Sequence, residues 1–376
     1  MTARACTRRG ARASRPLPIP QRPGRRRGYR VAVPRLVIRA SLAWLGPGRT
    51  VPDVQVVCEG GSITEVGRVA PVPETNELIV AEGFLMPAGA DRHVHVELGD
   101  PATIARRGVT AVRDLAWPAE RIFPLAEASE MPGFNGPFIR AAGPMLTAPG
   151  GYPTNAAWAP EDTGLEVADG ETAAGAVADL AARGAVAIKI SLNAEAGPTP
   201  SDAVLAAICD AAAEHDVPVT AHAEGAGQVA RALGAGVGEL AHTPWTERLD
   251  DATIAAAAAR QRWVSTLDIH GFGRDTPALR CALDNLARFH RASGEVVYGT
   301  DLGNGPIPSG VHIDELRWLR AAGLATEEVL QAFVRAPIEV GAPADLLVVG
   351  ESPLGDVAAL DDIRLVLRSG QVIAAH

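Results

Sequence analysis

The first residues whose type and spacing could do chemistry are two histidines, His93 and His95, on either side of Val94. In an extended strand, residues two apart point to the same face, so both imidazoles would project to one side. Neutral imidazole is a good ligand for zinc and related metals. The pair alone is weak evidence, because two core or surface histidines would give the same pattern.

Further polar side chains fall within or at the end of separate apolar runs: Lys189, His222, His242 and Asp301. A charged group in an apolar strand is costly unless it is paired or bound to a metal. Unrelated buried polar groups, each paired locally, would be the alternative. Their recurrence on separate runs favours one shared site. Lys189 is also the only lysine among 35 basic residues, which indicates a position where an amine is needed and a guanidinium would fail.

The elements that must position these residues alternate between short apolar runs and alanine-rich helical stretches. Eight strands alternating with helices predict an α/β fold that closes into a (β/α)8 barrel of the TIM type. His93 and Asp301 are 208 residues apart, and seven strand–helix steps of about 30 residues each would span that distance. The predicted strands are 84–96, 109–116, 137–145, 186–192, 217–224, 238–243, 263–269 and 295–302.

The two ends of the chain have a different pattern, with period-two apolar stretches broken by glycine and proline. We therefore predict a small β-sandwich domain formed by both termini, from residues 31–87 and 341–376, around a barrel of residues 88–340. Residues 1–30 contain ten arginines and no acidic residue, and we predict a disordered, dispensable tail there.

The charge distribution and the cysteines limit the function classes. Without residues 1–30 the formal charge is −19, which argues against nucleic acid as a partner. No run of about 18 apolar residues predicts a membrane span. The four cysteines are far apart and form no CxxC pair, as expected of reduced thiols in a cytoplasmic protein. We expect a small-molecule substrate, and a homo-oligomer is left open.

Several motifs, taken in order, resemble the amidohydrolase superfamily, most closely its imidazolonepropionase-like and prolidase-like members. The first is FLMPAGADRHVHV, and the others are VAIKI, TAHAEG, ELAHT and GTDLG; residues 309–333 and 343–354 resemble the helices and returning strands that follow. The resemblance covers roughly residues 35–376.

This resemblance implies a binuclear metal site with two divalent ions, zinc being favoured, although manganese and iron tolerate the same ligands. His93, His95 and Asp301 would hold the more buried ion, and His222 and His242 the more exposed one. Lys189, carboxylated by CO2, would bridge both ions together with a hydroxide. Asp301 would take the proton of that hydroxide and pass it to the leaving atom.

Substrate contacts are predicted at three positions after the strands: Tyr152, His270 and Arg274. Tyr152 stands where prolidase-like relatives often carry a histidine, which weakens a dipeptide substrate, and it could equally be an ordinary loop tyrosine. Glu224 is interpreted as structural. Because Lys189 is retained and His222 and Glu224 lack the His-x-x-Glu spacing, deamination is less favoured.

The leading hypothesis is a metal-dependent hydrolase that cleaves a C–N bond, in an amide or cyclic amide, of a small molecule. The alternatives are a lactonase or esterase, or a deaminase, on the same scaffold. A further alternative is a non-catalytic scaffold protein.

Overall fold

The computed structural model describes residues 35–376, which belong to one compact unit. The predicted tail at residues 1–30 lies outside the described residues. No boundary separates the described chain at residues 87 or 341, so the division into two domains stays a prediction.

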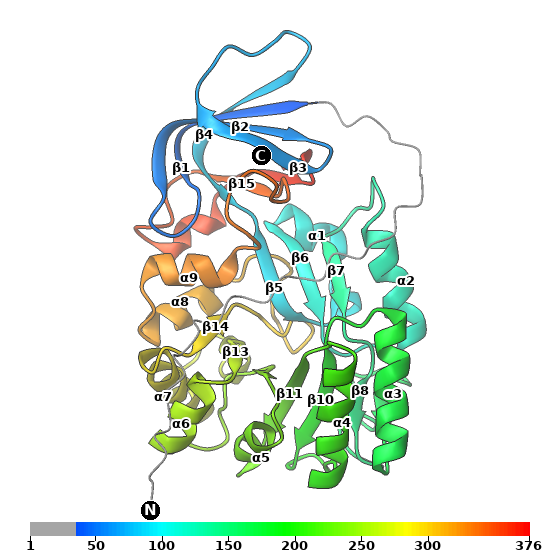
Figure 1. The fold of residues 1–376 in the computed structure, drawn as a ribbon. Coiled ribbons are helices and arrows are strands. Elements are labelled where there is room, and N and C mark those ends of the chain that lie inside the picture. The colour runs from blue at the N-terminus through cyan, green and yellow to red at the C-terminus, as the bar shows by residue number, and fades with distance from the viewer. Residues whose placement is uncertain (1–34) are drawn as a thin grey trace, which may run out of the picture. The chain divides into compact units, whose positions relative to one another are not determined.

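Both ends of the described chain contribute to one seven-stranded sheet (Figure 1). Its order is β17-β16-β15-β4-β1-β2-β3, with β1 parallel to β4 and the other neighbouring pairs antiparallel. The strands are β1 Leu36–Trp44, β2 Thr50–Glu59, β3 Ser62–Arg68, β4 Glu77–Pro87, β15 Leu346–Val349, β16 Ile363–Arg368 and β17 Gln371–Ala375.

The sheet curls so that the turn between β2 and β3 returns to the segment before β15. Ile63 N donates to Ala342 O at 2.8 Å, and Ala344 N donates to Gly61 O at 3.0 Å. The curl encloses an apolar interior that includes Ile38, Val56 and other buried residues. The predicted sandwich is therefore a single sheet that folds over its own core.

β4 leads directly into the barrel, whose strands run parallel (Figure 1). They form two sheets, β5-β6-β7 and β14-β13-β12-β11-β10-β8-β9. The strands are β5 Gly89–Val94, β6 Val109–Asp114, β7 Phe138–Ala141, β8 Met145–Thr147, β9 Gly164–Glu166, β10 Ile188–Asn193, β11 Val219–Glu224, β12 Glu239–Leu240, β13 Arg262–Val264 and β14 Glu295–Val297.

Backbone hydrogen bonds join the two sheets at both seams. Val186 N donates to Ala141 O at 2.9 Å, which connects the segment before β10 to β7. Arg92 N donates to Tyr298 O at 3.0 Å, and Asp301 N donates to His93 O at 2.8 Å, which connects β5 to the segment after β14. The predicted (β/α)8 barrel is confirmed.

The helices cover the outside of the strands (Figure 1). They are α1 Pro101–Arg106, α2 Ala119–Ser129, α3 Gly170–Arg183, α4 Asp202–Glu214, α5 Gln228–Gly234, α6 Asp251–Ala258, α7 Pro277–Arg291, α8 Ile313–Ala321 and α9 Thr326–Phe333, with short 3-10 turns η1 Val96–Leu98, η2 Asp268–His270 and η3 Val357–Asp361. Local sequence sets their ends: Asp169 caps α3, and Gly184 ends it in the left-handed conformation.

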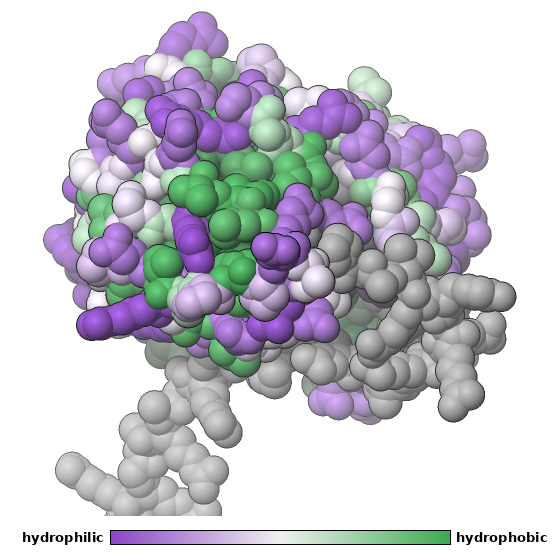
Figure 2. All heavy atoms as spheres, turned by 90° about the horizontal axis from the view of Figure 1, so that it is seen from above, coloured by the Kyte–Doolittle hydropathy of each residue, from purple (hydrophilic) through white to green (hydrophobic). Residues whose placement is uncertain are grey.

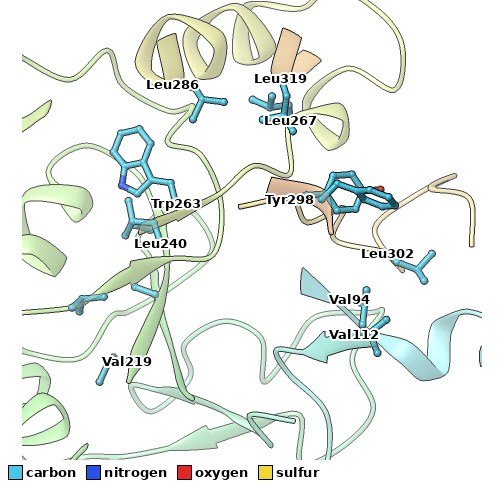
Figure 3. Close-up of a cluster of buried hydrophobic side chains, with 14 of the residues drawn as sticks. Val94, Val112, Val219, Leu240, Trp263, Leu267, Leu286, Tyr298, Leu302 and Leu319 are labelled. Carbon is cyan, nitrogen blue, oxygen red and sulfur yellow. The ribbon is translucent and has the colours of Figure 1, made fainter. Parts of the chain in front are cut away.

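Buried apolar side chains fill the space between strands and helices, as Figure 3 shows around Leu240, Trp263 and Leu286. The Trp263 ring stacks on Phe289 of α7, with ring centroids 3.8 Å apart. Cores packed this closely resist displacement, so the carboxyl ends of the strands are held in fixed positions.

The surface above the seven-stranded sheet gathers apolar atoms, as Figure 2 shows. Exposed apolar side chains of this sheet include Leu42, Leu78 and Val80. In residues 35–376, no helix combines the length and the apolar character needed to cross a membrane.

Candidate metal centre and pocket

The structure brings all six predicted metal ligands to one end of the barrel, where they line a cavity of about 200 Å3. Four of them lie at the end of a strand or in the residues just after it, which is where sites form in such barrels, and Lys189 and His222 lie within their strands. The six are His93 and His95 at the end of β5, Lys189 on β10, His222 on β11, His242 after β12 and Asp301 after β14.

The tightest cluster consists of His93, His95 and Asp301. Asp301 Oδ1 lies 3.1 Å from His93 Nε2 and 3.3 Å from His95 Nε2. Each imidazole Nδ1 faces a backbone carbonyl, Ala241 O at 2.9 Å and Ala116 O at 3.0 Å. A carbonyl only accepts, so each Nδ1 carries the hydrogen. In the neutral rings the Nε2 lone pairs then face the carboxylate, and a cation between them would remove the repulsion.

Asp301 is itself fixed by its backbone and by one of its two oxygens. Its φ is +58°, in the left-handed region, and its N–H donates to His93 O. Asn304 Nδ2 donates to Asp301 Oδ2 at 3.0 Å. Oδ1 is buried and has no hydrogen-bond donor among the described residues. The free oxygen is therefore the one directed at the two imidazoles.

The other imidazole pair has the same arrangement. His222 Nδ1 lies 3.0 Å from His242 Nε2. The remaining ring nitrogens have other partners: His222 Nε2 lies 2.9 Å from Glu224 Oε2, and His242 Nδ1 lies 2.9 Å from Thr266 Oγ1. If each ring donates to that outer partner, two lone pairs face each other. This pair also fits a cation.

Electrostatics favour the neutral ligand form of His93, His222 and His242, whereas at His95 burial lowers the pKa but Asp301 raises it above the usual value. Burial, together with the neighbouring Lys189, lowers the pKa of His93 well below its usual value. Burial and the neighbouring His93 do the same to the pKa of His242. Both imidazoles are therefore neutral near pH 7, which is the form that binds metals.

Lys189 is fully buried, and its Nζ has no hydrogen-bond partner among the described residues. Burial lowers the pKa of this amine to about 7. A substantial fraction is then uncharged near neutral pH, and an uncharged amine is the form that reacts with CO2. An unpartnered buried amine also indicates that something outside the protein completes its environment.

Of the three predicted substrate contacts, two line the cavity and one does not. The Tyr152 hydroxyl accepts a hydrogen bond from Trp158 Nε1 at 3.0 Å. His270 lines the cavity, and its Nε2 is buried without a partner among the described residues. Arg274 is exposed, and its Nε donates to Gly271 O at 3.4 Å.

Sequence reasoning missed several residues of the cavity wall, among them Asn193 and Trp245. Asn193 could have been found, because it follows Lys189 by four residues on one strand and so shares its face. Its Nδ2 donates to Glu224 Oε2 at 2.6 Å, which fixes the carboxylate beside His222. Glu224, interpreted as structural, also lines the cavity. Trp245 follows a strand end in a loop, where no periodicity marks it.

The fold and the site together define a (β/α)8 barrel protein with a candidate metal centre. Residues 84–373 match the amidohydrolase family, so the chain belongs to that family. A comparison with the curated proteins finds no match.

Solved structures of similar fold include a Xaa-Pro dipeptidase with bound methionine, at 19% identity and a TM-score of 0.77, with 91% of this chain and 100% of that chain covered. The ochratoxinase of A. niger has 19% identity and a TM-score of 0.76, with 92% and 96% covered. Phenylurea hydrolase B has 17% identity and a TM-score of 0.73, with 90% and 96% covered. At these identities the likeness establishes the fold alone.

Proposed function

We propose that this protein is a metal-dependent hydrolase that cleaves a C–N bond, other than a peptide bond, in a small amide or cyclic amide. The observation that carries the proposal is the set of metal-binding atoms. His93 and His95 each direct Nε2 at the buried Asp301 Oδ1, while their Nδ1 atoms bond to backbone carbonyls. His222 Nδ1 and His242 Nε2 are directed at each other. Around Asp301 that arrangement is unfavourable when empty and favourable around a cation, and the same holds for His222 and His242 where each ring donates its hydrogen to its outer partner.

We propose two divalent ions, zinc being favoured. His93, His95 and Asp301 would hold one ion, and His222 and His242 the other. Lys189 would bridge them after its neutral amine adds to CO2, forming an N–C bond and releasing a proton. Bound ions of this kind lower the pKa of water and polarise a carbonyl oxygen.

The residues of the chain then have separate tasks. The buried carboxylate of Asp301 would accept the proton of the attacking water and deliver it to the leaving nitrogen as the C–N bond breaks. Glu224 and Asn193 orient the His222 ring. Tyr152 and His270, on the cavity wall, contact the substrate.

Metal analysis and a substrate panel test this proposal. The purified protein should contain about two divalent ions per chain and hydrolyse members of a panel of neutral amides and cyclic amides. Turnover of lactones alone would favour the esterase alternative, and ammonia release without cleavage into two parts would favour a deaminase. A protein without bound metal and without turnover of any class would overturn the proposal.

A further inference from the structure

Two pairs of aromatic rings lie at the cavity, Trp245 with His270 and Tyr152 with Trp158, and all but Trp158 line it. Trp245 and His270 stack, with ring centroids 4.5 Å apart and planes 28° apart. The Tyr152 and Trp158 rings lie 6.2 Å apart, and the indole Nε1 of Trp158 donates to the Tyr152 hydroxyl. The His222 ring lies 5.3 Å from Tyr152 and 5.8 Å from Trp245. A flat group in the cavity would therefore meet aromatic rings, among them Tyr152, Trp245 and His270.

Cationic side chains are scarce on this cavity surface. Among the residues of 35–376 that line it, Lys189 is the only lysine or arginine, and it lies within the candidate metal centre. Arg274, which could have offered a guanidinium, is exposed and does not line the cavity. Two carboxylates do line it, Asp301 and Glu224. A substrate carboxylate placed away from the metal centre would meet no cation there, and a buried unpaired charge is costly.

The polar groups that remain suit an uncharged ligand. The Tyr152 hydroxyl already accepts from Trp158, so its own hydrogen can be donated to a ligand oxygen. His270 Nε2 is buried without a partner among the described residues and lines the same cavity. The cavity volume of about 200 Å3 is below the 300–1,000 Å3 of typical drug-sized sites and leaves room for about one ring.

We infer that the substrate is a small uncharged N-aryl amide, including ureas and carbamates, whose ring stacks on the Trp245–His270 wall, rather than a dipeptide or N-acyl amino acid with a free carboxylate. This inference rests on the proposed function for the reaction and on the cavity walls for the specificity. Trp245 is then the specificity-determining residue.

Three matched probes test the ligand class by calorimetry on the metal-loaded protein. Acetanilide carries a neutral aromatic ring, N-cyclohexylacetamide lacks the aromaticity, and 4-acetamidobenzoate adds one carboxylate far from the amide. Acetanilide should bind about three- to tenfold more tightly than the cyclohexyl probe, as stacking on an aromatic wall predicts. It should bind at least about tenfold more tightly than the benzoate, as an unpaired buried charge predicts. Equal or tighter binding of the benzoate, or no binding of acetanilide, would overturn the inference.

Two variants of Trp245 test whether this residue causes the preference for an aromatic ligand. Trp245→Phe keeps an aromatic face and should keep the aryl preference, whereas Trp245→Ala should reduce the affinity ratio between acetanilide and N-cyclohexylacetamide to about one. Circular dichroism and the Tm show whether Trp245→Ala folds. If it does not, the affinity ratio between acetanilide and N-cyclohexylacetamide is measured in Trp245→Leu instead. An unchanged ratio in the folded aliphatic variant would contradict the assignment of Trp245.

Turnover of the same probes separates this inference from the proposed function. If acetanilide binds with the expected preference and no amide is hydrolysed, the proposed function fails and the ligand class stands. If Xaa-Pro dipeptides or N-acyl amino acids are hydrolysed faster than neutral aryl amides, the inference fails and the hydrolase stands.

Discussion

The imidazole of His312 and the carboxylate of Asp268 lie 2.8 Å apart and connect the start of α8 to η2, the turn that carries Ile269 and His270 to the cavity. The other carboxylate oxygen of Asp268 accepts from Trp318 Nε1 at 2.9 Å and from Gly273 N at 2.8 Å. The buried carboxylate of Asp268 thus fixes η2 through its contacts with His312, Trp318 and Gly273. The position of His270 on the cavity wall therefore depends on α8.

Replacing Glu315 tests this support. Glu315 is fully buried, and its two oxygens accept from Leu267 N at 2.9 Å and from Asp268 N at 2.8 Å. In Glu315→Gln one acceptor becomes an NH2 donor that faces an N–H donor. We expect a loss of about 1–3 kcal/mol in the free energy of unfolding, measured by urea denaturation, because a buried donor loses its partner.

Asp314→Asn is the matched control, on the same turn of α8. Its side chain is 44% exposed and pairs with Arg317 on the surface, so we expect a change within about 0.5 kcal/mol. Equal losses in the free energy of unfolding in the two variants would show that the hydrogen bonds from Leu267 and Asp268 to Glu315 do not stabilise η2.

The pH dependence of stability should report the His312–Asp268 pair. Burial alone would lower the pKa of His312, but Asp268 and the nearby Glu315 raise it above its usual value. A raised histidine pKa contributes stability that is fully present below the unfolded pKa of about 6.5 and is lost as the pH rises through the folded pKa. The Tm of the wild type should therefore exceed that of His312→Gln most near pH 6, and the difference should shrink toward pH 9. A difference that grows with pH would contradict this sign. Burial raises the pKa of Glu315 to about 7 and His312 opposes that rise, so the difference between the two proteins reports this coupled pair together with Asp268.

Much of the fold and the candidate metal ligands could be predicted from the sequence because strand periodicity is local. His93 and His95 share a face by spacing alone, and Lys189, His222 and Asp301 fall within or at the end of apolar runs. The cavity wall could not be predicted in the same way. His270 and Arg274 are four residues apart in one loop, yet one lines the cavity and the other is exposed. The turn that carries His270 is fixed by the contacts of Asp268 with His312 and Trp318, which are 44 and 50 residues further along the chain, and no local pattern contains that information.

Removing metal should destabilise the protein as well as abolish turnover. Without a cation, His93 Nε2 and Asp301 Oδ1 remain 3.1 Å apart in a buried site, and the stabilisation from binding is lost. At a free metal concentration one hundred times the Kd, each site contributes about 2.7 kcal/mol. We expect a chelator to lower the Tm by about 5–10 °C, and added zinc to restore it. An unchanged Tm after complete metal removal would contradict a metal role for this cluster.

Lys189→Arg should lose far more function than a conservative substitution suggests. The guanidinium stays charged and cannot add CO2, so a buried cation would face the two candidate metal positions. We expect the metal content to fall from about two ions per chain to one or fewer, and kcat/KM to fall by at least about a hundredfold. Metal analysis and steady-state kinetics measure the two effects. A variant with normal metal content and normal rate would exclude a bridging role.

Lys189→Ala separates the loss of the bridge from the burial of a charge. Truncation leaves space beside the unpartnered position of Nζ, so short carboxylic acids such as acetate or propionate, added with zinc, can supply the two missing oxygens. We expect such acids to restore part of the turnover and of the metal content in Lys189→Ala, and to have no effect on Lys189→Arg, where the guanidinium fills the space. Rescue that is equal in both variants would indicate a general salt effect. A crystal structure of the active, metal-loaded enzyme with a bare amine at Lys189 would also rule out the carbamate, even though the metal ligands themselves could stand.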